Sequence, residues 1–301
     1  MALFHQASRR KSKARILLKG PSWGGKTTTA LLMAYGMTND GKGGHSWQRI
    51  AGIDTENNRM EMKAGMTFGD IKIDPFPVCQ IGRPFTVEKY LTAIAEAEKM
   101  PNIDVIIIDS ASHEWIGGGG ILDQKDKMSA SSTSNNNFGA WNILTPQHNR
   151  FVEAITTSTK HIIVTVRTKH GIVMVTGEDQ KTKVQKVPLD VMMRDGFEFE
   201  FSWVLNMVDG VAMVDKDDSS MFPRDTGFIP GPETGESIIS WINQGSDDPV
   251  PKTVLNRDPN AALCQCGSRA TLIETEDVCG KMVGIYKCMA ESKLFRKEVA
   301  L

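Results

Sequence analysis

Eight consecutive residues near the start of the chain have the types and the spacing of a phosphate-binding loop. The pattern G-x-x-x-x-G-K-[ST] is fitted by Gly20, Pro21, Ser22, Trp23, Gly24, Gly25, Lys26 and Thr27. The three glycines allow backbone N–H groups to turn toward a phosphate without Cβ clashes. Lys26 is then expected to reach the β- and γ-phosphates of a nucleotide, and the Thr27 hydroxyl to hold Mg²⁺. Together with Thr28, these residues form the predicted nucleotide-binding set.

The flanking residues decide whether this pattern is more than a chance glycine-rich turn. Residues 15–19 (RILLK) predict a short buried strand, and residues 28–37 (TTALLMAYGM) predict an apolar helix. A strand, a glycine loop and a helix in this order are the context in which the motif binds phosphate. The positive end of the helix dipole adds to the attraction.

Two acidic residues follow predicted strands further along the chain. Residues 50–54 (IAGID) predict a second strand, and Glu56 just beyond it is placed to deprotonate a water that attacks a γ-phosphate. The alternative for Glu56 is an exposed loop acid. Residues 105–108 are four β-branched apolar residues in a row, which is typical of a strand buried on both faces. Asp109 at the end of that strand is expected to hold Mg²⁺ through water, opposite Thr27.

The pattern as a whole predicts an α/β fold with a mainly parallel sheet and helices on both faces. Further helices are expected at residues 84–100, 138–157 and 237–242, and further strands at 161–166, 197–207 and 211–214. Arg167 and Lys169 come directly after the strand at 161–166. They would therefore place two cations at the sheet edge that carries the phosphates.

Composition excludes several classes of protein. Hydrophobic residues make up 40% of the 301 residues, charged residues 24%, and the net charge is −1, so no overall basic charge attracts nucleic acid. No apolar run reaches the length of a membrane span. Five cysteines in a chain of this length do not suggest a disulfide framework, so a reducing cytoplasm is expected.

Four segments are expected. Residues 1–13 are a basic arm, which either contacts nucleic-acid phosphates or is simply solvated; residues 14–245 are the core, 246–260 a linker and 261–301 a cysteine-bearing tail. Within the core, residues 116–137 are rich in Gly, Ser and Asn and are predicted not to order on their own. They form either a mobile functional loop or a surface insertion.

By residue 169 the motifs resemble those of the RecA-like recombinases, and more closely the phage-encoded RecA-like ATPases of the Sak type that assist single-strand annealing. The matching stretches are GPSWGGKT at 20–27, IDTE at 53–56, IIIDSASHEW at 106–115 and VTVRTK at 164–169. The resemblance covers about residues 14–242. It implies a RecA-like core that binds ATP and Mg²⁺, with Glu56 as the catalytic base and with Arg167 and Lys169 sensing the γ-phosphate.

The resemblance also implies partners. Two loops of RecA-like proteins line the DNA path, and their counterparts here are residues 116–137 and 170–186, the second with the predicted DNA-binding residues Lys181, Lys183 and Lys186. The alternative is that both are ordinary surface loops. A homo-oligomer, as a filament or a ring, and a single-strand DNA-binding protein are further expected partners, and no membrane is expected.

Three departures from the family concern oligomerisation and sensing. Thr165 stands where RecA has a glutamine sensor, so sensing falls to Arg167 or Lys169. Of two cations that reach the neighbouring subunit's nucleotide, only Lys216 fits, and Arg224 is the candidate substitute for the other. The long N-terminal helix of RecA is absent. At the N-terminus, the F-x-x-A pattern by which the RadA group polymerises is matched by Phe4 and Ala7.

The tail resembles a zinc finger of the GRF type, which binds single-stranded DNA. Cys264, Cys266 and Cys288 match its pattern, and Cys279 would supply the fourth thiolate of a tetrahedral Zn²⁺ site. The alternative is a degenerate remnant without metal.

Together these observations predict a Mg²⁺-dependent ATPase that binds single-stranded DNA and promotes phage DNA recombination or annealing in the host cytoplasm. Two alternatives stay open: a RecA-like helicase or helicase-loader subunit, and a nucleotide-switched binding protein with little turnover.

Overall fold

The protein is known from a computed structural model, which describes residues 7–38, 44–131, 137–176, 182–246, 270–278, 281–288 and 294–298. The chain divides into two compact units, Ser8–Ser246 and a second unit that contains the strands after residue 269. Among the described residues, no helix is both long and apolar enough to cross a membrane.

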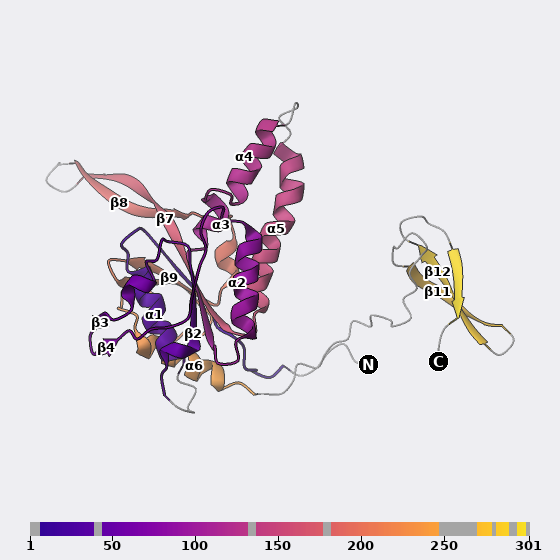
Figure 1. The fold of residues 1–301 in the computed structure, drawn as a ribbon, viewed down its shortest axis with the longest axis horizontal. Helices are drawn as coiled ribbons and strands as arrows, with labels where there is room; N and C mark the ends of the chain where they lie inside the picture. Colours follow the sequence, from indigo (N-terminus) through magenta and orange to yellow (C-terminus); the bar gives the residue numbers. More distant parts are fainter. Residues whose placement is uncertain are drawn as a thin grey trace. The chain divides into compact units, whose positions relative to one another are not determined.

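The first unit is built on one sheet with the strand order β10–β9–β1–β7–β6–β2–β5, while β8 pairs with the outer part of β7 (Figure 1). Its strands are β1 (Arg15–Gly20), β2 (Ile50–Asp54), β5 (Val78–Gln80), β6 (Val105–Asp109), β7 (His161–Thr176), β8 (Thr182–Val191), β9 (Trp203–Val208) and β10 (Val211–Asp217). The pairs from β9 to β5 are parallel, and the β10–β9 and β7–β8 pairs are antiparallel. The predicted α/β fold with a mainly parallel sheet is therefore confirmed.

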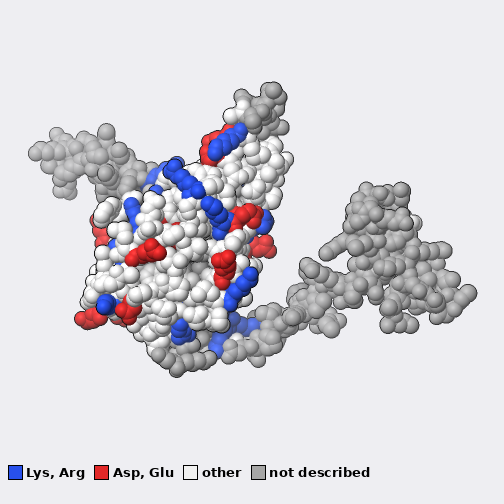
Figure 2. Space-filling model, viewed as in Figure 1, with Lys and Arg blue, Asp and Glu red and all other residues white. Residues whose placement is uncertain are grey.

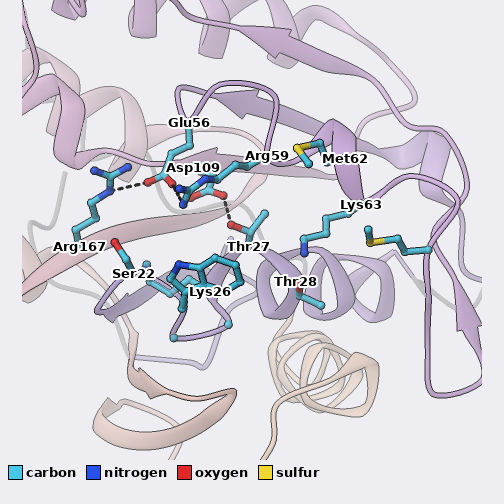
Figure 3. A pocket seen from close by; sticks show the side chains of 14 residues that line it. Ser22, Lys26, Thr27, Thr28, Glu56, Arg59, Met62, Lys63, Asp109 and Arg167 are labelled. Carbon is cyan, nitrogen blue, oxygen red and sulfur yellow. Dashed lines mark hydrogen bonds and ion pairs between the residues drawn. The ribbon is translucent and has the colours of Figure 1, made fainter.

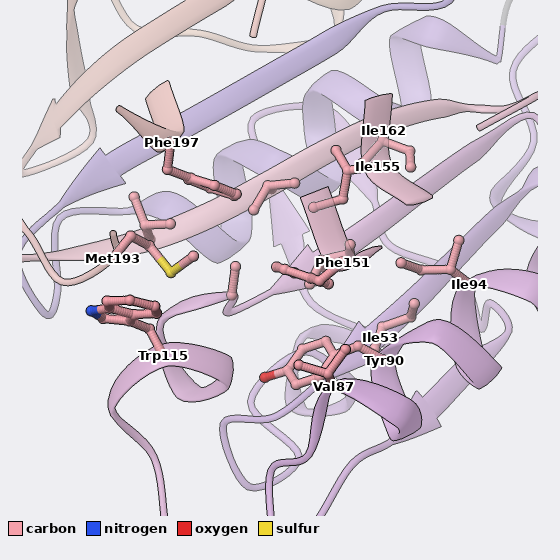
Figure 4. Close-up of a cluster of buried hydrophobic side chains, with 14 of the residues drawn as sticks. Ile53, Val87, Tyr90, Ile94, Trp115, Phe151, Ile155, Ile162, Met193 and Phe197 are labelled. Atoms are coloured by element: carbon pink, nitrogen blue, oxygen red, sulfur yellow. The ribbon is translucent and has the colours of Figure 1, made fainter. Parts of the chain in front are cut away.

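Helices cover both faces because successive strand residues point to opposite sides. In β6, Ile106 and Ile108 pack on one side against α2 (Val87–Lys99) and α5 (Asn137–Thr157), a cluster that Figure 4 shows around Tyr90 and Phe151. Val105 and Ile107 face the other side, where α1 and α6 lie. These helices span Lys26–Met37 and Pro232–Asn243. Short elements between β2 and β5 and just before β2 are η1 (Trp47–Arg49), η2 (Glu61–Lys63) and the ribbon of β3 (Thr67–Phe68) with β4 (Ile71–Lys72).

The parallel register brings the predicted chemical residues to one edge of the sheet. Asp54 at the end of β2 pairs with Asp109 at the end of β6, and Gly20 at the end of β1 pairs with Arg167 of β7. Segments that are far apart in the sequence thus converge at one edge of the sheet, where β1, β2 and β6 end and where β7 runs on past Arg167 to Thr176. The carboxyl ends of parallel strands are the usual place for ligands in such sheets.

The segment 116–137 was expected not to order on its own, and this expectation is wrong for most of its described part. Residues Ile121–Ser131 form helix α4, preceded by the short helix α3 (Ser112–Ile116). Ile121 is fully buried, and Leu122 and Met128 pack against the core cluster of α2 and α5. The segment as a whole is rich in Gly and Ser, but these few apolar residues bury enough surface to hold α4 against the core.

The alternating FEFE stretch was expected to begin a strand, but it forms a 3₁₀ helix, η3 (Phe197–Glu200). Gly196 starts it with a left-handed φ of 86°. The turn buries Phe197 and Phe201, four residues apart, and leaves Phe199 75% exposed. Helical spacing therefore prevails over the period of two, and the strand β9 begins only at Trp203.

The second unit contains an antiparallel sheet in the order β11–β12–β13. The strands span Ala270–Val278, Lys281–Cys288 and Leu294–Glu298. Of the predicted zinc ligands, Cys288 ends β12, whereas Cys264, Cys266 and Cys279 lie outside the described residues. Within the described residues there is no group of three or more side chains that could hold a metal ion.

His161, the first residue of β7, gives a test of this packing. Its Nδ1 accepts a hydrogen bond from the Ala14 backbone N–H at 3.0 Å, and burial, together with the charges of Lys13 and Arg15, lowers the pKa of His161 to about 3. The folded-state pKa lies below the unfolded value of about 6.5. The contribution of neutral His161 to the unfolding free energy is therefore complete above pH 6.5 and is lost as the pH falls toward 3.

Replacing His161 with Asn keeps a hydrogen-bond acceptor and removes the titration. When the pH falls from 7 to 5, the wild-type protein should lose about 2 kcal/mol more unfolding free energy than the His161→Asn variant. Urea unfolding of both proteins at the two pH values measures this. Equal losses in the two proteins would show that His161 does not control the acid sensitivity.

Candidate nucleotide-binding site

The phosphate-binding loop takes the backbone shape that its glycines allow. It leaves β1 at Gly20 and enters α1 at Lys26, with left-handed φ values of 69° at Trp23 and 89° at Gly25. A Cβ at Gly25 would lie 2.9 Å from the Cα of Gly210, which belongs to the turn between β9 and β10. That turn also donates a hydrogen bond from Gly210 N–H to the Gly24 carbonyl at 3.2 Å. The β9–β10 turn therefore packs directly against the phosphate-binding loop, and Gly25 has no room for a side chain.

A cavity of about 370 Å³ opens beside this loop (Figure 3). Residues 22–28 form its floor, and Glu56, Arg59, Asp109 and Arg167 form one wall. Met62, Lys63 and Met66, which follow β2, line the remaining side. The structure thus brings together the predicted loop, the two predicted acids and one of the two predicted cations.

Lys26 is buried at the base of the cavity. Its Nζ donates to the carbonyls of Gly20 at 2.9 Å and Pro21 at 2.7 Å, so one of its three N–H donors remains for another acceptor. Burial lowers the pKa of Lys26, although the carboxylates of Asp109 and Glu56 oppose this shift. A phosphate is an acceptor that would suit the remaining donor.

Asp109, at the end of β6, lies against Thr27, the second residue of α1. The Thr27 hydroxyl donates to Asp109 Oδ2 at 2.5 Å, and the Thr165 hydroxyl donates to Oδ1 at 2.5 Å. Burial and the nearby charge of Glu56 raise the pKa of Asp109, despite both hydrogen bonds. The pair offers a hydroxyl and a carboxylate side by side, which are the hard oxygen ligands that Mg²⁺ prefers.

Glu56 stands above the loop between two arginines (Figure 3). Arg167 Nε donates to Oε1 at 2.8 Å, and Arg59 donates to Oε2 at 2.9 Å. Burial alone would raise the pKa of Glu56, but the hydrogen bond and charge of Arg167, assisted by Arg59, hold it below its usual range. The side chain is therefore an ionised carboxylate at neutral pH.

Buried polar groups fix these residues in position. Asp54 Oδ1 accepts from the Glu56 backbone N–H at 2.6 Å, and Oδ2 accepts from that of Met60 at 2.9 Å. The carboxylate of Asp54 thereby shapes the turn that carries Glu56 and Arg59. In the same way, the Ser112 hydroxyl accepts from the Arg167 backbone N–H at 2.9 Å.

Several other predicted site residues lie elsewhere. Lys169 is exposed and does not line the cavity, and Lys216 donates to the Phe199 carbonyl at 3.1 Å and lies 3.9 Å from Asp218. Lys183 and Lys186 are on β8, whereas Lys181 lies outside the described residues. Ala7 is exposed, and Phe4 also lies outside the described part of the chain.

The residues that close the cavity after Glu56 are not among those predicted from the sequence. Arg59, Met62, Lys63 and Met66 come from the turn, η2 and the loop before β3. A cation three residues after a candidate base is a signal that could have identified Arg59. Nothing in the spacing of the two methionines marks them as cavity residues.

The fold and this site define a P-loop nucleotide-binding protein of the α/β class. ATP and Mg²⁺ fit the donors present: Lys26 and the loop amides for the phosphates, and Thr27 with Asp109 for the ion. A family model described as an AAA domain matches residues 12–212, so the chain belongs to that family. None of the curated proteins matches the chain.

Proposed function

We propose that the protein is a Mg²⁺-dependent ATPase that binds single-stranded DNA and serves phage DNA recombination or annealing. The observation that carries the ATPase part is the ionised, arginine-held Glu56 above a phosphate-binding loop with its lysine, threonine and Asp109 in place. Membership of the AAA-domain family supports a nucleotide-dependent activity.

In the proposed reaction a water molecule attacks the γ-phosphorus, its proton passes to the Glu56 carboxylate, and ADP leaves. Lys26 and the loop N–H groups hold the phosphates, and Arg167 and Arg59 stabilise the charge of the transferring group. Thr27 and Asp109 would hold Mg²⁺, which would supply positive charge against the phosphates. The buried Asp54 carboxylate holds the backbone of Glu56 in place, and this orientation of the base toward the attacking water would lower the activation barrier.

DNA binding is supported by two hairpins that extend from the core (Figure 1). The α4–α5 pair follows β6 through α3, and the β7–β8 hairpin continues β7 past Arg167. Both therefore start at the edge that carries the nucleotide cavity. A buried contact ties α3 to α5, since His148 Nδ1 lies 3.2 Å from both carboxylate oxygens of Glu114. In this proposal, the contact passes a change at the end of β6 on to the α4–α5 hairpin.

Positive and negative side chains are interspersed on the face seen in Figure 2, so binding would rely on local lysines rather than on an overall basic surface. Lys183 and Lys186 on β8 are the candidates. Each phosphate contact with a single strand contributes about 0.7 to the slope of log affinity against log salt concentration.

We expect oligothymidylate to raise the ATPase rate severalfold, and Lys183→Ala combined with Lys186→Ala to lower the salt slope by about 1.4. Fluorescence anisotropy at several salt concentrations measures the slope, and Lys72→Ala with Lys99→Ala is the control for loss of surface charge. A rate indifferent to DNA would favour a helicase-loader subunit or a nucleotide-switched binding protein instead.

A further inference from the structure

A second cavity, of about 660 Å³, lies next to the nucleotide cavity. The two share Glu56, Arg59, Met62 and Arg167 as a common wall. The second cavity is completed by Gly82, Arg83 and Phe85, which follow β5, and by His113 and Gly117 at the two ends of α3. It therefore belongs to the same edge of the sheet but lies on the far side of the arginine-held glutamate.

The charge of this cavity is strongly positive. Arg59, Arg83 and Arg167 line it, and Glu56 is its single carboxylate. Both oxygens of that carboxylate are already engaged by two of the arginines. Among the residues that the structure describes, no hydrogen bond or ion pair engages the guanidinium of Arg83. Three guanidinium groups converge here against one negative charge.

The other walls suit a compact anion with several oxygens. The rings of Phe85 and His113, which both line the cavity, stack on each other with their centroids 4.7 Å apart. Nδ1 of His113 contacts the Thr55 hydroxyl at 2.8 Å, and burial and the charge of Arg167 lower the pKa of His113. Gly82 adds no side chain, and a Cβ built there has no atom within 4 Å. Guanidinium groups bind the oxygens of phosphates and other oxyanions in pairs, so the lining fits a phosphate better than a neutral ligand.

We propose that this second cavity is a phosphate-binding site beside the nucleotide cavity, formed by Arg83 together with Arg59 and Arg167, which line both cavities. Two sources supply that chemistry: a phosphodiester of a bound single strand, or the inorganic phosphate that leaves the nucleotide. The first source rests on the proposed DNA binding, and the second only on hydrolysis. In either case the Glu56 wall connects the site to the nucleotide.

Gly82 allows a test that changes charge at constant shape. Its φ lies outside the left-handed region, so Gly82→Asp and Gly82→Asn introduce side chains of the same size without backbone strain. We expect Gly82→Asp to weaken phosphate binding at least about tenfold relative to Gly82→Asn, because the new carboxylate competes for Arg83. Arg83→Gln should have a similar effect, and Arg150→Gln, which removes an exposed arginine paired with Glu88, should have none.

Two binding measurements distinguish the sources. Equilibrium dialysis with labelled inorganic phosphate, at saturating ADP and Mg²⁺, reports the free ion; anisotropy of a labelled oligothymidylate reports the phosphodiester. A difference between the Asp and Asn variants in the first identifies inorganic phosphate as the ligand, and a difference in the second identifies the single strand.

Equal affinities of the Asp and Asn variants in both measurements would overturn the proposal. So would a wild-type protein that binds neither of the two probes. If no protein binds the oligonucleotide, the proposed DNA binding fails, while the phosphate measurement still decides the second cavity.

Discussion

Replacing Glu56 with Gln should lower kcat for ATP hydrolysis by at least about 100-fold, because an amide cannot take the proton of the attacking water. The affinity for ATP should stay the same or rise, since the variant removes a negative charge that faces the γ-phosphate. Single-turnover hydrolysis and binding of a fluorescent ATP analogue measure the two effects separately. A fall in kcat without a fall in affinity is the mark of a group that acts in the transition state.

The matched control is Glu61→Gln, which changes an exposed acid in η2, five residues further along the same segment. It should hydrolyse ATP at the wild-type rate. Because Arg167 and Arg59 both lose a charged partner in Glu56→Gln, thermal unfolding should accompany the kinetics, to show that the variant is folded. Normal turnover by Glu56→Gln would exclude this residue as the base.

The residues that could be predicted from sequence are those at the ends of predicted strands. Glu56 and Asp109 each follow a run of apolar residues, and the phosphate loop carries its own pattern. Parallel pairing of β2 with β6 then places Asp54 opposite Asp109, so the strand ends alone predict that these side chains lie close together. At these positions the local sequence pattern and the sheet geometry agree, and for this reason the residues of this part of the site could be predicted from the sequence.

The remaining residues depend on contacts that no local pattern encodes. Arg59 and Met62 reach the cavity because the buried Asp54 carboxylate bends the chain through the backbone N–H groups of residues 56 and 60. The direction of Lys216 is equally non-local: a bulge between Val214 and Lys216 shifts the register of β10 on β9. A single shift of this kind reverses the face that a side chain occupies.

Replacing Asp109 with Asn should have opposite effects on activity and on stability. The carboxylate is fully buried, and its raised pKa means that folding disfavours the ionised form in the protein without bound ions. An amide has the same shape and no charge. We therefore expect the unfolding free energy of the ligand-free variant to rise by about 1 kcal/mol, while Mg²⁺-dependent hydrolysis falls by at least about 100-fold.

Urea unfolding in EDTA measures the first effect, and the ATPase rate across a Mg²⁺ titration measures the second. Asp126→Asn, which changes an exposed acid of α4, is the control and should alter neither. A less stable variant would mean that the hydrogen bonds from Thr27 and Thr165 outweigh the cost of burying the charge. Wild-type hydrolysis would mean that another group holds the metal. Gain in stability together with loss of hydrolysis would instead show that the fold tolerates an unfavourable buried charge because the reaction requires it.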